Sequence, residues 1–243
     1  HIVSRRQRQM CIRDRIKIVK KIIAIGGVGV TPQSDKNLDN FILDQSKKIK
    51  KNIGLLATAS KDDEEKINSY YKRFENTNSE LSHFNLTSNV NGFSEWLLDK
   101  DLIYIGGGNT SFMLEIWKKN NLEKIFKTAY EKGIILSGVS AGAVCWFDWI
   151  LSDSMGLGFK PLKGINLVEG SCTPHSSNNE RMSKFEFDIK NNKLPEGIAI
   201  DDGVAVVFID GKPAEVYSTV DNHNAYFLDK NKKINLREYI KIL

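Results

Sequence analysis

Short apolar runs alternate with longer amphipathic stretches along this chain from Ile16 onward, and this alternation restricts its fold more than any other feature. The runs are rich in Ile, Leu, Val and Ala, as expected of strands that are covered on both faces of a parallel sheet. The stretches between them have apolar residues at helical spacing. Strands that alternate with helices predict an α/β fold, a three-layer sandwich around a mostly parallel sheet.

The predicted strands are short and strongly apolar: Lys21–Ile25, Ile53–Ala57, Leu102–Ile105, Ile134–Ser137, Ile198–Ile200 and Ala205–Ile209. The predicted helices are longer and amphipathic: Asn37–Lys50, Asp62–Asn76, Thr110–Lys118, Leu122–Lys132, Ala141–Ile150 and Asn179–Asn191. Near the end of the chain, an Asp-Gly turn at Asp210 and Gly211 separates two further extended runs, Val204–Ile209 and Ala214–Ser218. That pattern predicts a C-terminal antiparallel hairpin that extends the sheet.

The composition excludes several classes of protein. With 243 residues the chain can bury the core of one α/β domain. No apolar run approaches the roughly 18 residues that a membrane span needs, so no membrane partner is expected. Three widely spaced cysteines (Cys11, Cys145 and Cys172) predict reduced thiols and a cytoplasmic location. The four histidines form no His/Cys cluster, so neither a metal site nor a cofactor is expected.

The net charge of +5 is concentrated at the start of the chain. Residues 1–15 contain five arginines and one aspartate, so residues 16–243 carry only +1 of the total. A nearly neutral protein gives no reason to expect a nucleic-acid partner. We expect residues 1–15 to form a disordered extension, whose Arg-rich composition resembles translated cloning sequence rather than native protein. Residues 16–243 are expected to form a single α/β domain.

The segment Gly138-Val139-Ser140-Ala141-Gly142 lies between a predicted strand and a predicted helix. A Gly-x-Ser-x-Gly turn in this position strains the serine backbone and exposes its hydroxyl at the top of the sheet. The helix N-terminus that follows favours developing negative charge. These properties indicate that Ser140 is a nucleophile, although a glycine-rich turn of this kind also occurs as a packing turn or a phosphate-binding turn.

A second glycine-rich turn, Gly106-Gly107-Gly108-Asn109-Thr110, follows the strand Leu102–Ile105. It lacks the Lys-Ser/Thr ending of a P-loop, which weakens a nucleotide-binding interpretation. The backbone N–H of Gly107 or Gly108, together with that of Ala141, would instead form an oxyanion hole. Asn109 would either add a side-chain donor or cap the next helix. Because the carboxyl ends of parallel strands share one edge, these turns should converge on one pocket with Gly26-Gly27 and Thr58–Ser60.

A serine nucleophile needs a general base, and His175 is the best candidate for it. His175 follows an apolar segment and Pro174, whereas His83 and His223 lie in polar segments and His1 lies in the terminal extension. The alternative is a histidine with a structural role. Asp202, just beyond a short strand, is the leading candidate for the acid that orients the imidazole. The competing acids are Asp201, Glu196 and Asp153, and each could equally be a turn or cap residue.

Four motifs in this order resemble the peptidase E (α-aspartyl dipeptidase) family of serine peptidases, which includes cyanophycinase-like relatives. They are Gly106–Thr110, Gly138–Ala143, Pro174-His175 and Asp201–Ala205, and the resemblance covers most of residues 17–228. It implies a fold like that of the class I glutamine amidotransferases (flavodoxin-like) and a Ser-His-acid triad. It also implies hydrolysis of dipeptides or short peptides with an N-terminal aspartate. The chain order Ser140, His175, Asp202 differs from the order in α/β-hydrolases, where the acid precedes the histidine.

The resemblance also bears on the substrate. The acid of the family is Asp or Glu, which keeps Glu196 as an alternative. Arg181 is the one basic residue between Ser176 and Ser183 and would pair with the substrate's carboxylate, because a guanidinium matches a carboxylate bidentately. Its alternative is an exposed helix charge. The expected partner is a small peptide and the expected state is a monomer or homodimer. The alternative functions are cyanophycinase-like β-aspartyl peptide hydrolysis and non-catalytic binding of a small ligand.

Overall fold

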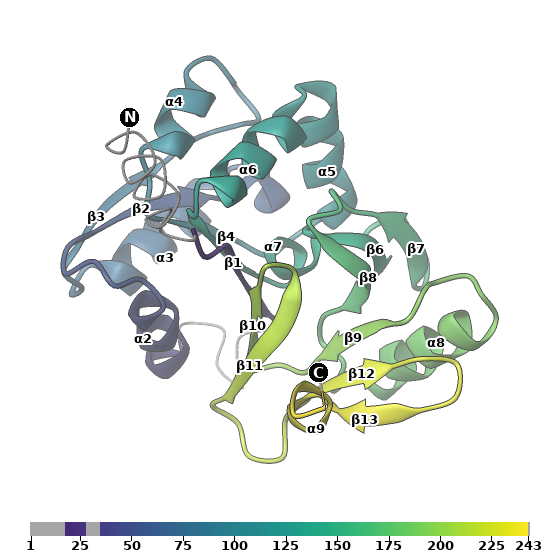
Figure 1. The fold of residues 1–243 in the computed structure, drawn as a ribbon. Coiled ribbons are helices and arrows are strands. Elements are labelled where there is room, and N and C mark those ends of the chain that lie inside the picture. The colour runs from purple at the N-terminus through teal and green to yellow at the C-terminus, as the bar shows by residue number, and fades with distance from the viewer. Residues whose placement is uncertain (1–17, 28–34, 243) are drawn as a thin grey trace, which may run out of the picture.

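The computed structural model describes residues 18–27 and 35–242, and its larger sheet has seven strands (Figure 1). Their order across the sheet is β11-β10-β1-β5-β4-β2-β3. The five strands from β1 to β3 are mutually parallel, whereas β10 and β11 are antiparallel to their neighbours. The bounds are β1 Lys21–Ile25, β2 Lys51–Leu56, β3 Ser79–His83, β4 Leu102–Ile105, β5 Ile135–Val139, β10 Val204–Ile209 and β11 Lys212–Ser218.

Both faces of this sheet are buried under helices. Along β1, Ile22 and Ala24 enter one hydrophobic core, and Ile23 and Ile25 enter another. Helices α2 (Lys36–Asp44) and α3 (Glu64–Phe74) pack into the second core. Helices α4 (Phe93–Leu98), α5 (Thr110–Lys119) and α6 (Leu122–Glu131) pack into the first. This arrangement confirms the predicted α/β sandwich with its mostly parallel sheet.

The predicted hairpin is the β10–β11 pair. Its turn consists of Asp210 and Gly211, which both have positive φ (51° and 82°), as a tight two-residue turn requires. Strand β10 pairs antiparallel with β1, so the hairpin extends the sheet on the side opposite β3. Its inner strand is buried and its outer strand is partly exposed.

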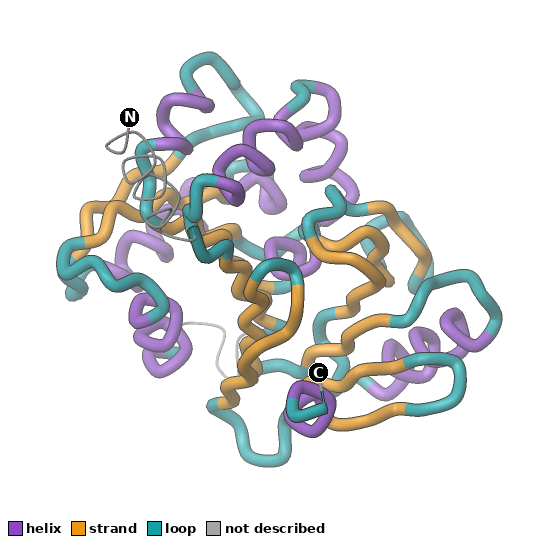
Figure 2. Tube along the Cα trace, viewed as in Figure 1, coloured by secondary structure: helices purple, strands orange, loops and turns teal. Residues whose placement is uncertain are grey.

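A second sheet has six strands in the order β13-β12-β9-β8-β6-β7, and the sequence did not reveal it (Figure 2). Strands β6, β8 and β9 are parallel to one another. Strand β7 is antiparallel to β6, β12 to β9, and β13 to β12. Helix α8 (Asn179–Lys190) packs its buried side chains on this sheet, and α9 (Leu236–Ile240) contacts β12. The bounds are β6 Phe147–Ser152, β7 Lys160–Lys163, β8 Val168–Thr173, β9 Gly197–Ile200, β12 Ala225–Leu228 and β13 Lys233–Asn235.

The predicted helix over Ala141–Ile150 is wrong beyond its first turn. Helix α7 ends at Val144, and β6 begins at Phe147. Aromatic and β-branched side chains favour strands, and Phe147, Trp149 and Ile150 supply them in this segment. Pairing with β8 on one side and β7 on the other then outweighs helical propensity. The helix predicted to end at Lys50 also stops early, at Asp44, and Lys51 begins β2.

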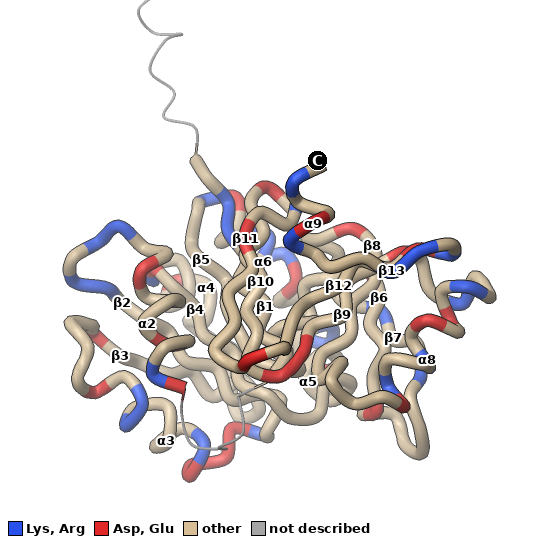
Figure 3. Tube along the Cα trace, turned by 90° about the horizontal axis from the view of Figure 1, so that it is seen from below, with Lys and Arg blue, Asp and Glu red and all other residues tan. Residues whose placement is uncertain are grey.

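Figure 3 shows acidic and basic residues interspersed around the periphery of the molecule, with the central strands largely free of charge. Within residues 18–27 and 35–242, no helix combines the length and apolar character that a bilayer crossing demands. The cysteines of the described part, Cys145 and Cys172, are both buried and free. The predictions for residues 1–15, including Cys11, lie outside the described residues.

Candidate active site

Ser140 occupies a strained turn between β5 and α7. Its φ of 55° and ψ of −111° fall where a side chain is disfavoured. A hydrogen bond from its amide to the Ile25 carbonyl (2.9 Å) fixes the turn to the end of β1. Gly142 allows the tight packing that follows, because a Cβ there would lie 2.2 Å from the Ile105 carbonyl oxygen. The strand ends of the sheet therefore hold the serine hydroxyl at the carboxyl edge.

His175 reaches this hydroxyl from the second sheet. It follows β8 after Pro174, has a positive φ of 51°, and donates its amide N–H to the Gly26 carbonyl (3.2 Å). Its Nε2 lies 2.8 Å from Ser140 Oγ, and its Nδ1 lies 2.5 Å from Asp202 Oδ1. One imidazole ring thus connects the serine hydroxyl to a carboxylate.

Asp202 follows β9 and accepts hydrogen bonds on both carboxylate oxygens. His175 contacts Oδ1, and the Ser177 hydroxyl donates to Oδ2 at 2.8 Å. Partial burial opposes ionisation of this carboxyl, but the two hydrogen bonds together with charge interactions with His175 and His223 outweigh burial and hold the pKa of Asp202 below its ordinary value. Asp202 is therefore ionised at neutral pH and can stabilise a protonated imidazole.

The absence of a side chain at Gly27 provides the space in which His175 and Asp202 meet. It forms an isolated parallel bridge with Asp202, and its amide oxygen accepts a hydrogen bond from Gly203 (2.8 Å). A Cβ on Gly27 would lie 1.7 Å from Asp202 Oδ1 and 2.7 Å from His175 Nδ1. The sequence predicts that Gly27 lies at a strand end near the pocket, but it assigns this residue no role. The signal was the doubled glycine directly after a strand, which is typical of a close backbone approach.

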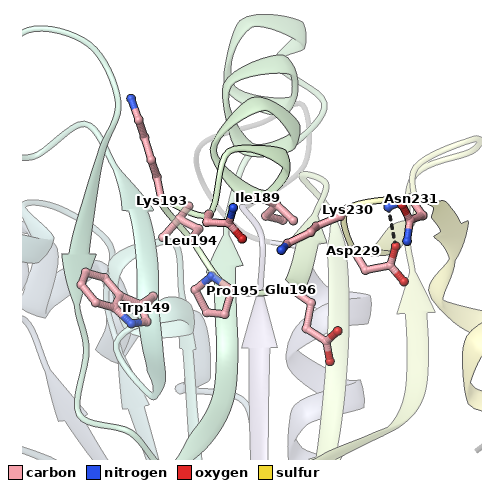
Figure 4. Close-up of a pocket in the computed structure, with 10 residues that line it drawn as sticks. Trp149, Ile189, Lys193, Leu194, Pro195, Glu196, Asp229, Lys230 and Asn231 are labelled. Atoms are coloured by element: carbon pink, nitrogen blue, oxygen red, sulfur yellow. Dashed lines mark hydrogen bonds between the residues drawn. The ribbon is translucent and has the colours of Figure 1, made fainter.

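The other candidate acids lie elsewhere or bond other groups. Glu196 precedes β9, at the opposite end of that strand from Asp202, and it lines a separate hollow of about 530 Å³ (Figure 4). Asp153 pairs with Arg181. Asp201 is buried, and its carboxylate accepts hydrogen bonds from the Ser176 hydroxyl (2.6 Å) and the Asn224 amide (3.0 Å).

The second glycine turn lies beside the serine. A Cβ on Gly107 would sit 3.2 Å from Ser140 Cβ. In the described part of the chain, no acceptor bonds the amide of Gly107, Gly108 or Ala141. Free amides next to a serine hydroxyl can stabilise an oxyanion.

Asn109 has a different role at this turn. Its side chain caps α5 by accepting from the Phe112 amide (2.8 Å), and its own amide donates to the Ala59 carbonyl (2.7 Å). Both of these groups are therefore engaged in the local structure. The side-chain nitrogen Nδ2, which the oxyanion interpretation would use as donor, lies 3.4 Å from the Ser154 carbonyl oxygen, so the contacts of Asn109 fit the cap interpretation better.

A pocket of about 240 Å³ opens beside Ser140 and His175. Its walls come from both sheets and from α8: Gly108, Thr110, Ser140, Val144, Ile150, Leu151, Ser152, Asp153, Pro174, His175 and Arg181. This volume lies just below the roughly 300–1,000 Å³ of typical small-molecule sites, so it admits one residue-sized group.

Arg181 provides a buried positive charge in this pocket. Its side chain is only 6% exposed, which contradicts the alternative of an exposed helix charge. Its Nη2 lies 2.7 Å from Asp153 Oδ2, and its guanidinium lies 4.5 Å from the centre of the Phe159 ring. Burial lowers the pKa of Arg181, and the charges of Asp153 and Asp202 counteract that shift. A guanidinium has five N–H groups, and two of those of Arg181 bond the Leu151 carbonyl and the Asp153 carboxylate.

Across the described ranges, no group of three or more His, Cys, Asp or Glu side chains is arranged to hold a metal ion.

Comparisons with known proteins identify the family of this chain. The family model described as Peptidase family S51 matches residues 22–216. An uncharacterized peptidase, YgaJ, of Bacillus subtilis (strain 168) is 35% identical over 211 residues, which cover 86% of this chain and 91% of that protein. The chain therefore belongs to peptidase family S51, the peptidase E family, and is a serine-type peptidase.

Two solved structures share the fold. A peptidase from an acI-B1 Actinobacterium superposes with a TM-score of 0.65 at 17% identity, covering 89% of this chain and 93% of that one. A putative peptidase E from Listeria monocytogenes EGD-e gives a TM-score of 0.56 at 18% identity, covering 89% and 98%. At these identities the likeness concerns the fold alone.

Proposed function

We propose that this peptidase is an exopeptidase that hydrolyses dipeptides or short peptides with an N-terminal aspartate. Ser140, His175 and Asp202 would act as its catalytic triad. The observation that carries this proposal is the continuous contact from Ser140 Oγ through the imidazole to Asp202, at 2.8 and 2.5 Å. Hydrogen-bond reach between nucleophile, base and orienting acid is the geometric requirement for nucleophilic catalysis.

The mechanism follows from these contacts. With Nδ1–H donating to Asp202, His175 Nε2 accepts the Ser140 proton as the hydroxyl attacks the scissile carbonyl. The resulting oxyanion faces the free amides of Gly107 or Gly108 and Ala141. His175 then protonates the leaving amine, which leaves an acyl-enzyme on Ser140. A water molecule, deprotonated by the same histidine, hydrolyses the acyl-enzyme.

The preference for an N-terminal aspartate rests on the pocket. Arg181 offers guanidinium N–H groups to a substrate carboxylate, and Asp153 offers a carboxylate to a substrate α-ammonium group. An N-terminal aspartate carries both of these charges within one residue. The pocket of about 240 Å³ has room for a residue-sized group, which supports cleavage after the first residue of the substrate.

The test compares wild type with Ser140→Ala on aspartyl-p-nitroanilide, Asp-Leu and a β-Asp-Arg dipeptide. We expect Ser140-dependent cleavage of the first two substrates. Cleavage of the β-linked dipeptide alone would replace this proposal with a cyanophycinase-like activity. Absence of any Ser140-dependent cleavage would overturn both and favour a small-ligand binder. Equal circular dichroism spectra of the two proteins serve as the folding control.

The cytoplasmic location and the monomeric or homodimeric state remain predictions. Size-exclusion chromatography with light scattering would determine the oligomeric state directly.

A further inference from the structure

Two successive serines after His175 bond two successive aspartates after β9. Ser176 Oγ donates to Asp201 Oδ1 at 2.6 Å, and Ser177 Oγ donates to Asp202 Oδ2 at 2.8 Å. The pairs are neighbours in sequence but differ in their surroundings. Ser176 and Asp201 are buried, whereas Ser177 is exposed and Asp202 is half-buried.

The buried pair is structural. Asp201 also accepts from the Asn224 amide, and the Ser176 amide donates to the Ile200 carbonyl (3.1 Å). Together these bonds fasten the loop after His175 to the end of β9 and to the segment before β12. None of these contacts involves the imidazole of His175 or the hydroxyl of Ser140.

In the second pair, Ser177 bonds the same Asp202 carboxylate that bonds His175. A carboxylate with one oxygen bonded can rotate about its Cβ–Cγ bond and still be solvated. With Oδ1 on His175 and Oδ2 on Ser177, rotation of the Asp202 carboxylate would break both bonds. The Ser177 hydroxyl also stabilises the ionised form, because hydrogen bonds to charged groups are stronger than neutral ones.

We infer that Ser177 is a positioning residue, which fixes the orientation and the ionised state of Asp202 and thereby the alignment of His175 toward Ser140. This inference rests on the proposed function of the triad. Ser177 does not itself touch the position of the reacting atoms in this arrangement. It acts through Asp202.

Other charged groups also act on Asp202. His175 contacts Oδ1, His223 Nδ1 bonds the Asp202 carbonyl oxygen at 2.8 Å, and the charge of Arg181 reaches the carboxylate from α8. None of these three interactions with Asp202 runs through Ser177. The effect of Ser177 can therefore be isolated from theirs.

The experiment compares Ser177→Ala, Ser177→Thr and Ser176→Ala with wild type. For Ser177→Ala we expect kcat on aspartyl-p-nitroanilide to fall about tenfold with KM nearly unchanged, as loss of one charge-assisted hydrogen bond implies. The part of the acidic limb of the kcat profile that reports protonation of Asp202 should move to higher pH, because Asp202 without the Ser177 bond is protonated more easily. Ser177→Thr keeps the hydroxyl and should restore both properties.

Ser176→Ala is the matched control. It removes the buried partner of Asp201 and should lower the unfolding temperature without moving the acidic limb. A purely structural Ser177 would behave in the same way. An unshifted limb and an unchanged kcat in Ser177→Ala would overturn the inference while leaving the peptidase proposal intact.

A second readout needs no turnover. The ¹³C resonance of the Asp202 carboxyl, titrated by NMR in wild type and in Ser177→Ala, reports its protonation directly. We expect a higher midpoint in Ser177→Ala, and equal midpoints would refute the positioning role even if no tested peptide were cleaved. If wild type shows no Ser140-dependent cleavage, that result counts against the proposed function but not against the positioning role of Ser177.

Discussion

The two sheets supply different parts of the candidate site by different means. The seven-stranded sheet presents Ser140 and the amides of Gly107 and Ala141 through backbone geometry: a strained φ, glycines packed against carbonyls, and a helix that begins directly after the serine. The six-stranded sheet presents His175 and Asp202 through side-chain hydrogen bonds at half-exposed positions. Substitutions on the first side should therefore act through strain and packing, and those on the second through orientation and charge.

The largest effect is expected at Ser140. Both Ser140→Ala and Ser140→Gly should reduce kcat by roughly 10⁴-fold or more, because both remove the nucleophile. Their stabilities should differ. Glycine relieves a strain of about 1–3 kcal/mol, which exceeds its entropy cost of about 1 kcal/mol, so Ser140→Gly should be roughly 1 kcal/mol more stable than Ser140→Ala. Chemical denaturation measures this difference, and equal stabilities would show that the turn is not strained.

Gly27→Ala tests the junction between the sheets. The added methyl group would overlap Asp202 Oδ1 and displace the carboxylate. A displacement of about 1 Å should lower kcat/KM roughly 10²-fold. Crystallography or the NMR titration of Asp202 would show the displacement. Wild-type activity in a folded Gly27→Ala protein would contradict the tight packing described here.

Arg181→Ala tests the charge that α8 adds to the pocket. We expect kcat/KM for aspartyl-p-nitroanilide to fall by about 10²-fold, with a much smaller change for alanyl-p-nitroanilide, because a charged hydrogen bond to the substrate is lost. Arg73→Ala is the matched control, since Arg73 is equally buried and also pairs with an aspartate, Asp39. It should lower stability without changing the preference between the two substrates. An equal loss on both substrates in Arg181→Ala would assign Arg181 a structural role.

Asn109→Ala should have the smallest effect. Loss of the α5 cap should cost about 1 kcal/mol of stability, while Asn109→Ser, which keeps a capping oxygen, should retain most of it. Neither variant should change kcat by more than about twofold. A tenfold fall in kcat for Asn109→Ala alone would restore the oxyanion interpretation of its side chain.

The sequence predicted the first sheet far better than the second. Continuous apolar runs such as Lys21–Ile25 are buried on both faces, so they stand out without structural information. Strands such as β7 (Lys160–Lys163) and β13 (Lys233–Asn235) are short, edge-like and partly exposed, and they lack a period that separates them from loops. Local spacing predicts a helix for the aromatic residues of β6. The segment is a strand because pairing with neighbouring strands, which a single sequence does not show, decides its conformation.

The candidate site likewise contains residues that local sequence patterns predict and residues that depend on tertiary contacts. Ser140 and Gly107 could be predicted because strained turns require glycines at fixed positions. Asp202 was the leading candidate for the acid, but Asp201, Glu196 and Asp153 stayed open as alternatives, since which carboxylate reaches His175 depends on where β9 ends in space. The bond between Ser177 and Asp202 joins distant segments, and a single sequence carries no signal for it. At Gly27 the doubled glycine indicates a close approach, but the sequence does not show that Asp202 and His175 are the groups approached.

The hydrogen bonds that join the two sheets at the end of β1 affect when the site can form during folding. The carbonyls of Gly26 and Gly27 bond His175 and Gly203, so the base and the acid come together only on an already folded first strand. A chain that is incompletely assembled would carry a serine with no partner to activate it. Peptidase activity would then appear only in completely folded molecules. The rate at which activity appears during refolding would therefore report the rate at which the two sheets associate.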